Sequence, residues 1–372
     1  MKTIPFFLAI LLCLSACLPE HLQPEENPAL ALPRLSAGPQ IGIIQGFNGD
    51  NPPAIQDTIE NRMAEARTAG MKIARVQVDW ADLEPQPREY DFADLRAALE
   101  ENQALGLETM LTLSTYDSDD LTIPEDLKSE AIDSEATLDR LFALLDQMVP
   151  ILSQHGVWLM TIANEPDTHF EENPDLWRNL RNMLIAVRDY SHELDPDLAI
   201  SMTFTEGGFH QDVRGIRELV KECDLACFNY YGQNILGEAD DMETVRRDIR
   251  DMLRAFPDQE LVLQELGCSV GYAQNSRMVG ASVENQRLFF ETVFSLMNTE
   301  DRFRASYVFQ MVDWSPATAN IYRDPLLDAG LDEDFVLMYL ESLETLGLVD
   351  FQTGESRASW SEFLKWLTFF DR

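Results

Sequence analysis

The stretch VWLMTIANEP, residues 157–166, contains an apolar, β-branched run that ends abruptly in polar residues. Such a run is typical of a strand buried on both faces of a sheet. An amphipathic helical pattern precedes it over 138–153 and stops before Gly156, and a second helical pattern follows over 177–192. A buried strand between two amphipathic helices is the unit from which α/β folds with a parallel sheet are built.

The same unit repeats along the chain in both directions. Further apolar runs lie at 41–46, 72–78, 107–113, 198–204, 225–230, 261–264 and 305–311. Further helical patterns lie at 55–69, 92–105, 242–255 and 283–296, and the first two end before Gly70 and Gly106. Eight strands separated by helices predict a (β/α)8 TIM barrel, a single domain over residues 39–372. The alternative is an open doubly wound sheet, but no G-x-G-x-x-G follows the first strand.

Two carboxylates follow strands that lie on opposite sides of the predicted barrel. Glu165 follows Asn164 at the end of the fourth strand, and Glu265 follows Gln264 at the end of the seventh. Chemistry in such barrels takes place at the carboxyl ends of the strands. A pair of carboxylates is what glycosidic cleavage requires, one as the acid and one as the nucleophile or the base.

Several side chains at the same strand ends are candidates for support of this pair. Arg75 in the second strand and the Tyr231 hydroxyl after the sixth are expected to hold Glu265 ionised. Asn164 is expected to bind a sugar hydroxyl near the reacting carbon. The alternative for Arg75 is a pair with a structural carboxylate near the barrel top.

Two tryptophans complete the set of candidates. Trp314, after the eighth strand, is expected to form a flat stacking floor for a sugar ring, and Trp80, after the second strand, to line the site. For both residues the alternative is packing at the barrel rim. Glu206, followed by Gly207 and Gly208 after the fifth strand, is a rival carboxylate whose loop context favours a structural role.

In order along the chain, the motifs resemble those of clan A of the glycoside hydrolases, which are retaining (β/α)8 enzymes. The matching segments are ARVQVDWADLEPQPREYDF (74–92), TIANEP (161–166), FNYYG (228–232), VLQELG (262–267), VDWSP (312–316) and LGLVDFQTGESRASWSEFL (346–364). The resemblance implies that Glu165 is the general acid/base and Glu265 the nucleophile, with Tyr231 contacting Glu265. A departure is Gln264, since Thr or Ser is frequent before the nucleophile in this clan.

The function expected from this resemblance is retaining hydrolysis of β-glycosidic bonds in an oligo- or polysaccharide, without metal or organic cofactor. The five histidines show no metal-ligand spacing, which agrees with that expectation. Two alternatives stay open: a catalytically silent barrel that binds glycan at the cell surface, and an envelope transglycosylase.

The N-terminus has the pattern of an exported lipoprotein. Lys2 is followed by an apolar run too short to span a bilayer, and the run ends in LSAC, which resembles a bacterial lipobox. We therefore expect a signal peptide over 1–16, lipidation of Cys17 and a Pro-rich tether over 17–38. Leu18 favours the outer membrane of the bacterial envelope.

The net charge of the chain limits the classes of partner that it can bind. Lys and Arg number 28 against 65 Asp and Glu, which gives a formal net charge of −37. Such a chain repels phosphate backbones and polyanionic polysaccharides, so a neutral glycan is expected and nucleic acid is not. Outside the expected signal and lipid site, Cys223, Cys227 and Cys268 allow one disulfide and one free thiol.

Overall fold

The computed structural model describes residues 38–46, 51–118, 120–170, 173, 175–211, 215–234, 236–328 and 330–372. The expected signal peptide, Cys17 and all of the tether except Gly38 lie outside these residues. Within the described ranges, no helix combines the length and the hydropathy that a membrane crossing needs.

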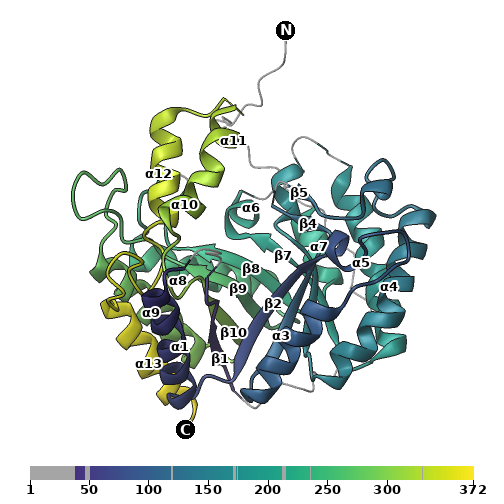
Figure 1. Ribbon diagram of the computed structural model, residues 1–372, viewed down its shortest axis with the longest axis horizontal. Coiled ribbons are helices and arrows are strands. Elements are labelled where there is room, and N and C mark those ends of the chain that lie inside the picture. The colour runs from purple at the N-terminus through teal and green to yellow at the C-terminus, as the bar shows by residue number, and fades with distance from the viewer. Residues whose placement is uncertain are drawn as a thin grey trace.

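Eight parallel strands alternate with helices and form a nearly closed (β/α)8 barrel (Figure 1). The barrel strands are β1 (Gln40–Ile43), β2 (Ile73–Asp79), β3 (Glu108–Ser114), β6 (Leu159–Asn164), β7 (Ala199–Thr205), β8 (Ala226–Tyr231), β9 (Leu261–Gly267) and β10 (Phe303–Val308). Hydrogen bonds connect them in the order β1-β10-β9-β8-β7-β6-β3-β2. Each of the eight strands expected from the sequence is present, which confirms the predicted fold.

The two ends of this order, β1 and β2, lie against each other at Gly42. A Cβ atom on Gly42 would lie 2.8 Å from the backbone oxygen of Ile73 and 2.9 Å from the Tyr307 ring. Real Cβ atoms do not come that close, so only glycine lets the first strand approach the second. Gly42 therefore permits the near closure of the barrel.

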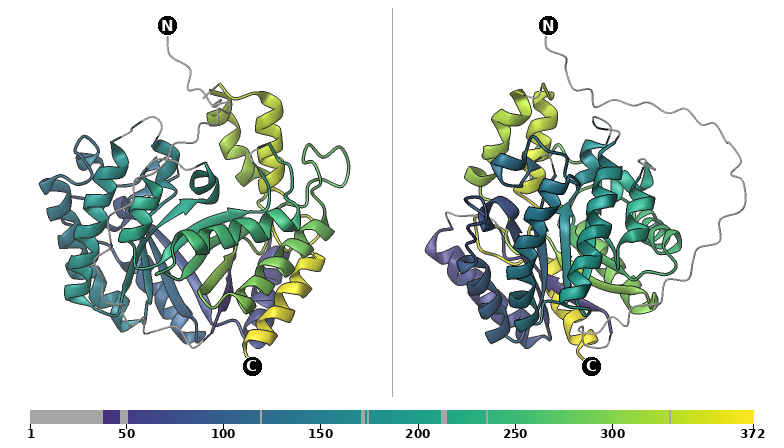
Figure 2. Two further views of the ribbon diagram at one scale, coloured as in Figure 1. Left: turned by 180° about the vertical axis from the view of Figure 1, so that it is seen from behind. Right: turned by 90° about the vertical axis from the view of Figure 1, so that its right-hand side faces the viewer.

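The helices surround the strands in all views (Figures 1 and 2). They are α1 (Pro53–Thr68), α2 (Trp80–Leu83), α3 (Ala93–Ala104), α4 (Glu135–Gln154), α5 (Leu176–Leu194), α6 (Glu206–His210), α7 (Ile216–Glu222), α8 (Met242–Ala255), α9 (Val283–Thr299), α10 (Pro316–Ala319), α11 (Arg323–Asp328), α12 (Glu333–Leu343) and α13 (Ala358–Phe370). The glycines predicted to end three of them, Gly70, Gly106 and Gly156, have φ values of 110°, 72° and 69°. These left-handed values confirm the predicted helix ends.

Two features were not expected from the sequence. A short hairpin of β4 (Tyr116–Asp117) and β5 (Asp120–Leu121) follows β3, and β4 pairs with the end of β6. The helices α10, α11 and α12 stand at the end of the barrel opposite the C-terminus (Figure 1). Both features lie at the carboxyl ends of the strands.

The three cysteines Cys223, Cys227 and Cys268 are buried and free, so the disulfide allowed by the sequence does not form.

The barrel interior changes from apolar to polar along the strands. Ile73, Met110, Leu159 and Val262 belong to a buried apolar cluster in the first half of the barrel. Successive inward positions in a strand are two residues apart. Two residues further along the same four strands stand Arg75, Thr112, Thr161 and Gln264. The apolar floor thus gives way to a polar layer directly beneath the predicted site.

Candidate active site

Gln264 on β9 connects this polar layer. The side chain has 0% exposure. Its Oε1 accepts hydrogen bonds from the hydroxyls of Thr203 at 2.7 Å, Thr161 at 2.8 Å and Thr112 at 3.0 Å. Its Nε2 donates to Asn164 Oδ1 at 2.8 Å. A buried amide with partners on four other strand positions is held in one orientation, so it fixes the residues above it.

Glu265, the next residue on β9, is bound by two donors. Arg75 Nη1 lies 2.8 Å from Glu265 Oε1, and the Tyr231 hydroxyl donates to Glu265 Oε2 at 2.6 Å. The Arg75 side chain is 2% exposed and that of Glu265 10%. A guanidinium and a phenol hydroxyl both favour the ionised form of a carboxyl group. Burial, then the charges of Glu265 and Glu165, hold the pKa of Tyr231 well above its usual value, so it remains a donor.

Glu165 has a different environment. It follows β6 in the left-handed conformation, with φ 52° and ψ 39°. Asn229 Nδ2 donates to its Oε1 at 2.8 Å and Ser118 Oγ to its Oε2 at 2.9 Å. Burial, then the negative charge of Glu265, raise the pKa of Glu165 to about 8, although the two hydrogen bonds oppose the shift. This environment favours the protonated form of Glu165.

The two carboxylates belong to one electrostatic site. The strands that carry them, β6 and β9, are separated in the barrel by β7 and β8. The charge of Glu265 is nonetheless the second largest cause of the Glu165 shift. One carboxyl group pairs with a cation, and the environment of the other favours its protonated form. Environments that shift the pKa values of two carboxyl groups apart permit one to act as an acid and the other as a nucleophile in the same site.

Asn164 lies within a hydrogen-bonded network. Its Nδ2 donates to Asp117 Oδ1 at 2.8 Å, while its Oδ1 accepts from Gln264 and from Asn229 Nδ2 at 3.1 Å. Gln77 Nε2 donates to the other Asp117 oxygen at 2.8 Å. Asn164 is 4% exposed. Its hydrogen bonds therefore serve mainly to orient the side chains around it. Contact with a sugar hydroxyl stays a prediction.

The structure does not bring Trp80 to this group. Its indole has 0% exposure, and Nε1 donates to Glu84 Oε2 at 2.9 Å. Glu84 in turn pairs with Arg140. A side chain without exposed surface does not reach a sugar, so the packing alternative describes Trp80.

Trp314 lies after β10, among the helices that follow the last strand. It is 8% exposed and belongs to an apolar cluster with Val336 and Leu340 of α12. Its ring centroid lies 5.4 Å from that of Tyr322. Most of its surface is therefore used in packing, and its role as a stacking floor stays a prediction.

Sequence reasoning did not assign a role to Ser118, Asp117 or Asn229. Asn229 carries a usable signal, because it is a polar residue near the end of an apolar strand; in the structure it is the register partner of Glu265. Asp117 and Ser118 lie at the β4–β5 hairpin, which has no apolar run to reveal it. Only the pairing of β4 with β6 brings them to Glu165.

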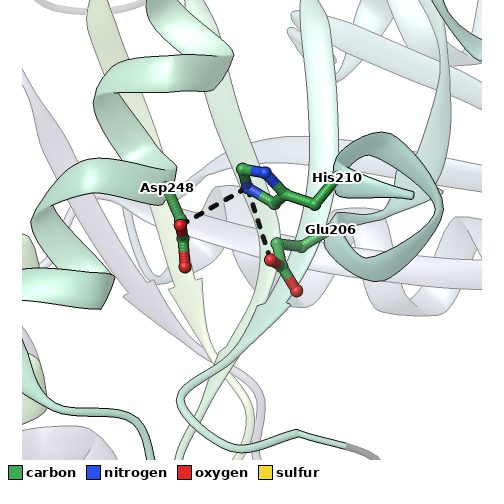
Figure 3. Close-up of side chains that lie close together, drawn as sticks. All are labelled: Glu206, His210 and Asp248. Atoms are coloured by element: carbon green, nitrogen blue, oxygen red, sulfur yellow. Dashed lines mark ion pairs between the residues drawn. The ribbon is translucent and has the colours of Figure 1, made fainter. Parts of the chain in front are cut away.

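The rival carboxylate Glu206 begins α6 and has other neighbours. His210 Nε2 lies 3.4 Å from Glu206 Oε1 and 3.8 Å from Asp248 Oδ1 (Figure 3). Burial, then the charges of Asp248 and Asp240, raise the pKa of Glu206 to about 8. Since its charged neighbours come from α8 and the segment before it, Glu206 belongs to a separate group.

Comparison with known proteins gives a likeness of fold. No family model matches the chain, and no curated protein matches its sequence. A solved structure of GH5_18 from Bifidobacterium longum subsp. longum superimposes with a TM-score of 0.65 at 14% identity, over 88% of this chain and 78% of that one. A variant of GH5_18 from the same source, in complex with Manβ1-4GlcNAc, has a TM-score of 0.64 at 13% identity, over 89% and 78%. An exo-β-1,4-mannosidase from Opitutaceae bacterium strain TAV5 has a TM-score of 0.62 at 14% identity, over 88% of this chain and 59% of that one.

Proposed function

We propose that the chain is a retaining glycoside hydrolase that cleaves β-glycosidic bonds by double displacement. The observation that carries the proposal is the unequal environment of two carboxyl groups at one barrel mouth. Glu265 is bound by Arg75 and Tyr231, and Glu165 has a pKa of about 8. This is the division of states that a nucleophile and a general acid need.

In the proposed first step, a Glu265 oxygen attacks the anomeric carbon. The bond from that carbon to the leaving oxygen breaks, and the leaving oxygen takes the proton of Glu165. A glycosyl ester on Glu265 results. Tyr231 and Arg75 bind the two oxygens of the attacking carboxylate and fix its direction.

In the second step, Glu165 takes a proton from water while the water oxygen attacks the anomeric carbon. The ester bond to Glu265 breaks, and the sugar leaves with its original configuration. The ester carries no negative charge, so one cause of the raised Glu165 pKa is removed in the intermediate. The pKa of Glu165 therefore falls in the intermediate, so its carboxylate stays ionised and can accept a proton from water. The mechanism also predicts that the two carboxyl groups lie about 5–5.5 Å apart.

The proposed substrate is a neutral β-linked glycan, with β-mannosides as the first class to test. The net charge of −37 disfavours an anionic polysaccharide. The similar structures include one bound to Manβ1-4GlcNAc and one named as an exo-β-1,4-mannosidase.

A screen of nitrophenyl β-glycosides and Manβ1-4GlcNAc, with NMR of the first product anomer, tests the function. We expect hydrolysis in which the β anomer appears first, and none in the matched control Glu265→Gln. Binding without turnover on any glycan supports the silent barrel instead. Transfer to a sugar acceptor in place of water supports the transglycosylase. An α anomer as first product contradicts double displacement.

We also propose that the protein is held in the bacterial envelope by lipid on Cys17, which lies outside the described residues. The support is the apolar segment and the LSAC sequence. Fatty-acid labelling of the wild type and of Cys17→Ala tests it. Labelling that persists in Cys17→Ala contradicts the anchor.

A further inference from the structure

A second group of chemically active side chains lies between α6 and α8 (Figure 3). Glu206 and His210 stand four residues apart on α6, and Asp248 lies on α8. One oxygen from each carboxylate and one ring nitrogen lie within 4.8 Å of one another. Asp248 is 5% exposed, whereas Glu206 and His210 are partly open to solvent. The group thus combines one buried carboxylate with two side chains that solvent can reach.

The distances between these atoms are similar to the distances between ligand atoms around a bound metal ion. His210 Nε2 lies 3.4 Å from Glu206 Oε1 and 3.8 Å from Asp248 Oδ1. Both distances exceed the usual length of a hydrogen bond, about 2.7–3.2 Å. Tetrahedral zinc with bonds of about 2.0–2.2 Å holds its ligand atoms about 3.4 Å apart. The single nitrogen also faces both carboxylates, as a shared ion requires.

The hydroxyl of Tyr230 is an independent observation at the same place. Tyr230 on β8 is 0% exposed, and its hydroxyl oxygen has no hydrogen-bond partner among the residues that the structure describes. Burial raises the pKa of Tyr230, and the charges of Asp248, Asp240 and Glu206 raise it further. The hydroxyl is therefore within electrostatic range of these carboxylates. A buried hydroxyl is expected to bond to a water or an ion where the protein offers it no partner.

Negative charge exceeds positive charge around the group. Arg247 Nε lies 3.2 Å from Asp248 Oδ1, but the Arg247 side chain is 60% exposed. Arg217 is the other cation that acts on His210. The carboxylates that act on His210 or Glu206 are Asp240, Asp248 and Asp251. A carboxylate oxygen accepts more than one partner, so the contact of Asp248 with Arg247 leaves room for a metal.

We propose that Glu206, His210 and Asp248 bind one divalent transition metal, with Zn²⁺ as the best representative. One imidazole with two carboxylates favours this class over Mg²⁺ or Ca²⁺, which prefer oxygen ligands alone. The Tyr230 hydroxyl would bond to a water on the metal. No metal site was expected from the sequence, because the five histidines show no metal-ligand spacing.

Such a metal would stabilise the segment that follows β7. Thr205 Oγ1 accepts from Gly208 N at 2.8 Å and donates to Asp167 Oδ2 at 2.6 Å, two residues beyond Glu165. A bond from α6 to α8 would therefore also steady the loop that carries the proposed acid. The metal has no part in the bond-breaking steps proposed above.

Equilibrium dialysis of the full chain against ZnCl₂, after treatment with a chelator, tests the proposal. We expect one Zn²⁺ per chain and a Tm that rises with zinc concentration. His210→Gln and Asp248→Asn should bind at least about 100-fold more weakly, since each removes a ligand. His210 is partly exposed, so its variant should fold, as circular dichroism can check. The matched control is His192→Gln, because in the described part of the chain His192 pairs with one carboxylate only, Asp224 at 3.0 Å.

Tyr230→Phe refines the test, since it removes the hydroxyl and keeps the ring. We expect zinc binding about 10-fold weaker, the smaller effect of a group outside the ligand set. Unchanged binding in Tyr230→Phe overturns the part given to the hydroxyl. The metal site is overturned if the wild type binds no stoichiometric Zn²⁺, if His210→Gln binds as the wild type does, or if His192→Gln loses the ion equally.

Discussion

Glu165 and Glu206 follow neighbouring strands, β6 and β7, and both have pKa values raised to about 8. In both cases burial is the largest cause and a second carboxylate is the next. The second carboxylate differs, however. For Glu165 it is Glu265, which is paired with Arg75, and for Glu206 it is Asp248, which lies beside His210. The same shift therefore arises in two different chemical settings.

The comparison shows that a perturbed pKa marks a crowded buried carboxylate without saying what it does. The partners carry that information. Amide and hydroxyl donors from Asn229 and Ser118 hold Glu165, and its partner carboxyl group, Glu265, is bound by Arg75. Glu206 shares a ring nitrogen with another carboxylate, an arrangement suited to an ion. Substitutions around Glu165 should therefore lower activity and leave metal binding unchanged. Substitutions around Glu206 should weaken metal binding and change activity little.

The largest effect is expected for Glu265→Ala. Without a nucleophile no covalent intermediate forms, so activity should fall by at least about 10⁴-fold on natural and activated substrates alike. Steady-state rates on a glycan and on a dinitrophenyl glycoside measure this. Full activity of the variant would place the site elsewhere.

Glu165→Ala should lose about 10²–10⁴-fold on a natural glycan, the usual contribution of a general acid. The loss should be smaller with a dinitrophenolate leaving group, which departs without a proton. Added azide should then accelerate turnover, because it replaces the water that Glu165 would activate. Azide rescue in Glu265→Ala with a glycosyl azide of retained configuration would show that the two roles are exchanged, because azide would then attack a covalent intermediate on Glu165.

A smaller effect is expected for Tyr231→Phe. The variant keeps the ring but loses the hydrogen bond of 2.6 Å to Glu265. Hydrogen bonds to charged groups contribute about 1.5–3 kcal/mol, so kcat/KM should fall about 10–150-fold. The same loss in Tyr230→Phe, whose hydroxyl lies in the other group, would contradict the assignment of Tyr231.

The smallest effect on catalysis is expected for Glu206→Gln, below about tenfold. A protonated Glu165 is required, so kcat/KM of the wild type should fall as the pH rises through about 8. This alkaline limb should persist in Glu206→Gln, although Glu206 has a similar pKa. Loss of the limb in that variant would identify Glu206 as the titrating acid.

The eight strands were predictable because each is an apolar run of ordinary length bounded by helical patterns. Glu165 and Glu265 were predictable because they end such runs, and the (β/α)8 fold brings all strand ends to one mouth. Asp117 and Ser118 were not, since a two-residue strand leaves no pattern. The packing of Trp80 against Glu84 depends on contacts that spacing does not encode.

The group around His210 shows the same limit. Glu206 and His210 lie four residues apart, a spacing that places two side chains on one helix face. Asp248 belongs to another helix, and only the packing of α6 near α8 brings it to the ring nitrogen. A third ligand from a distant segment is therefore found in the structure rather than in the motif.

Trapping of the covalent intermediate tests the central claim most directly. The probe is a 2-deoxy-2-fluoro β-glycoside of the preferred sugar with a dinitrophenolate leaving group. The fluorine slows both steps through their oxocarbenium-like transition states, whereas the good leaving group keeps the first step fast, so the glycosyl-enzyme accumulates. Peptide mass spectrometry then locates the bound sugar. We predict one adduct per chain, on Glu265. An adduct on Glu165 or Glu206, or hydrolysis with inversion and no adduct, would contradict double displacement by the Glu165–Glu265 pair.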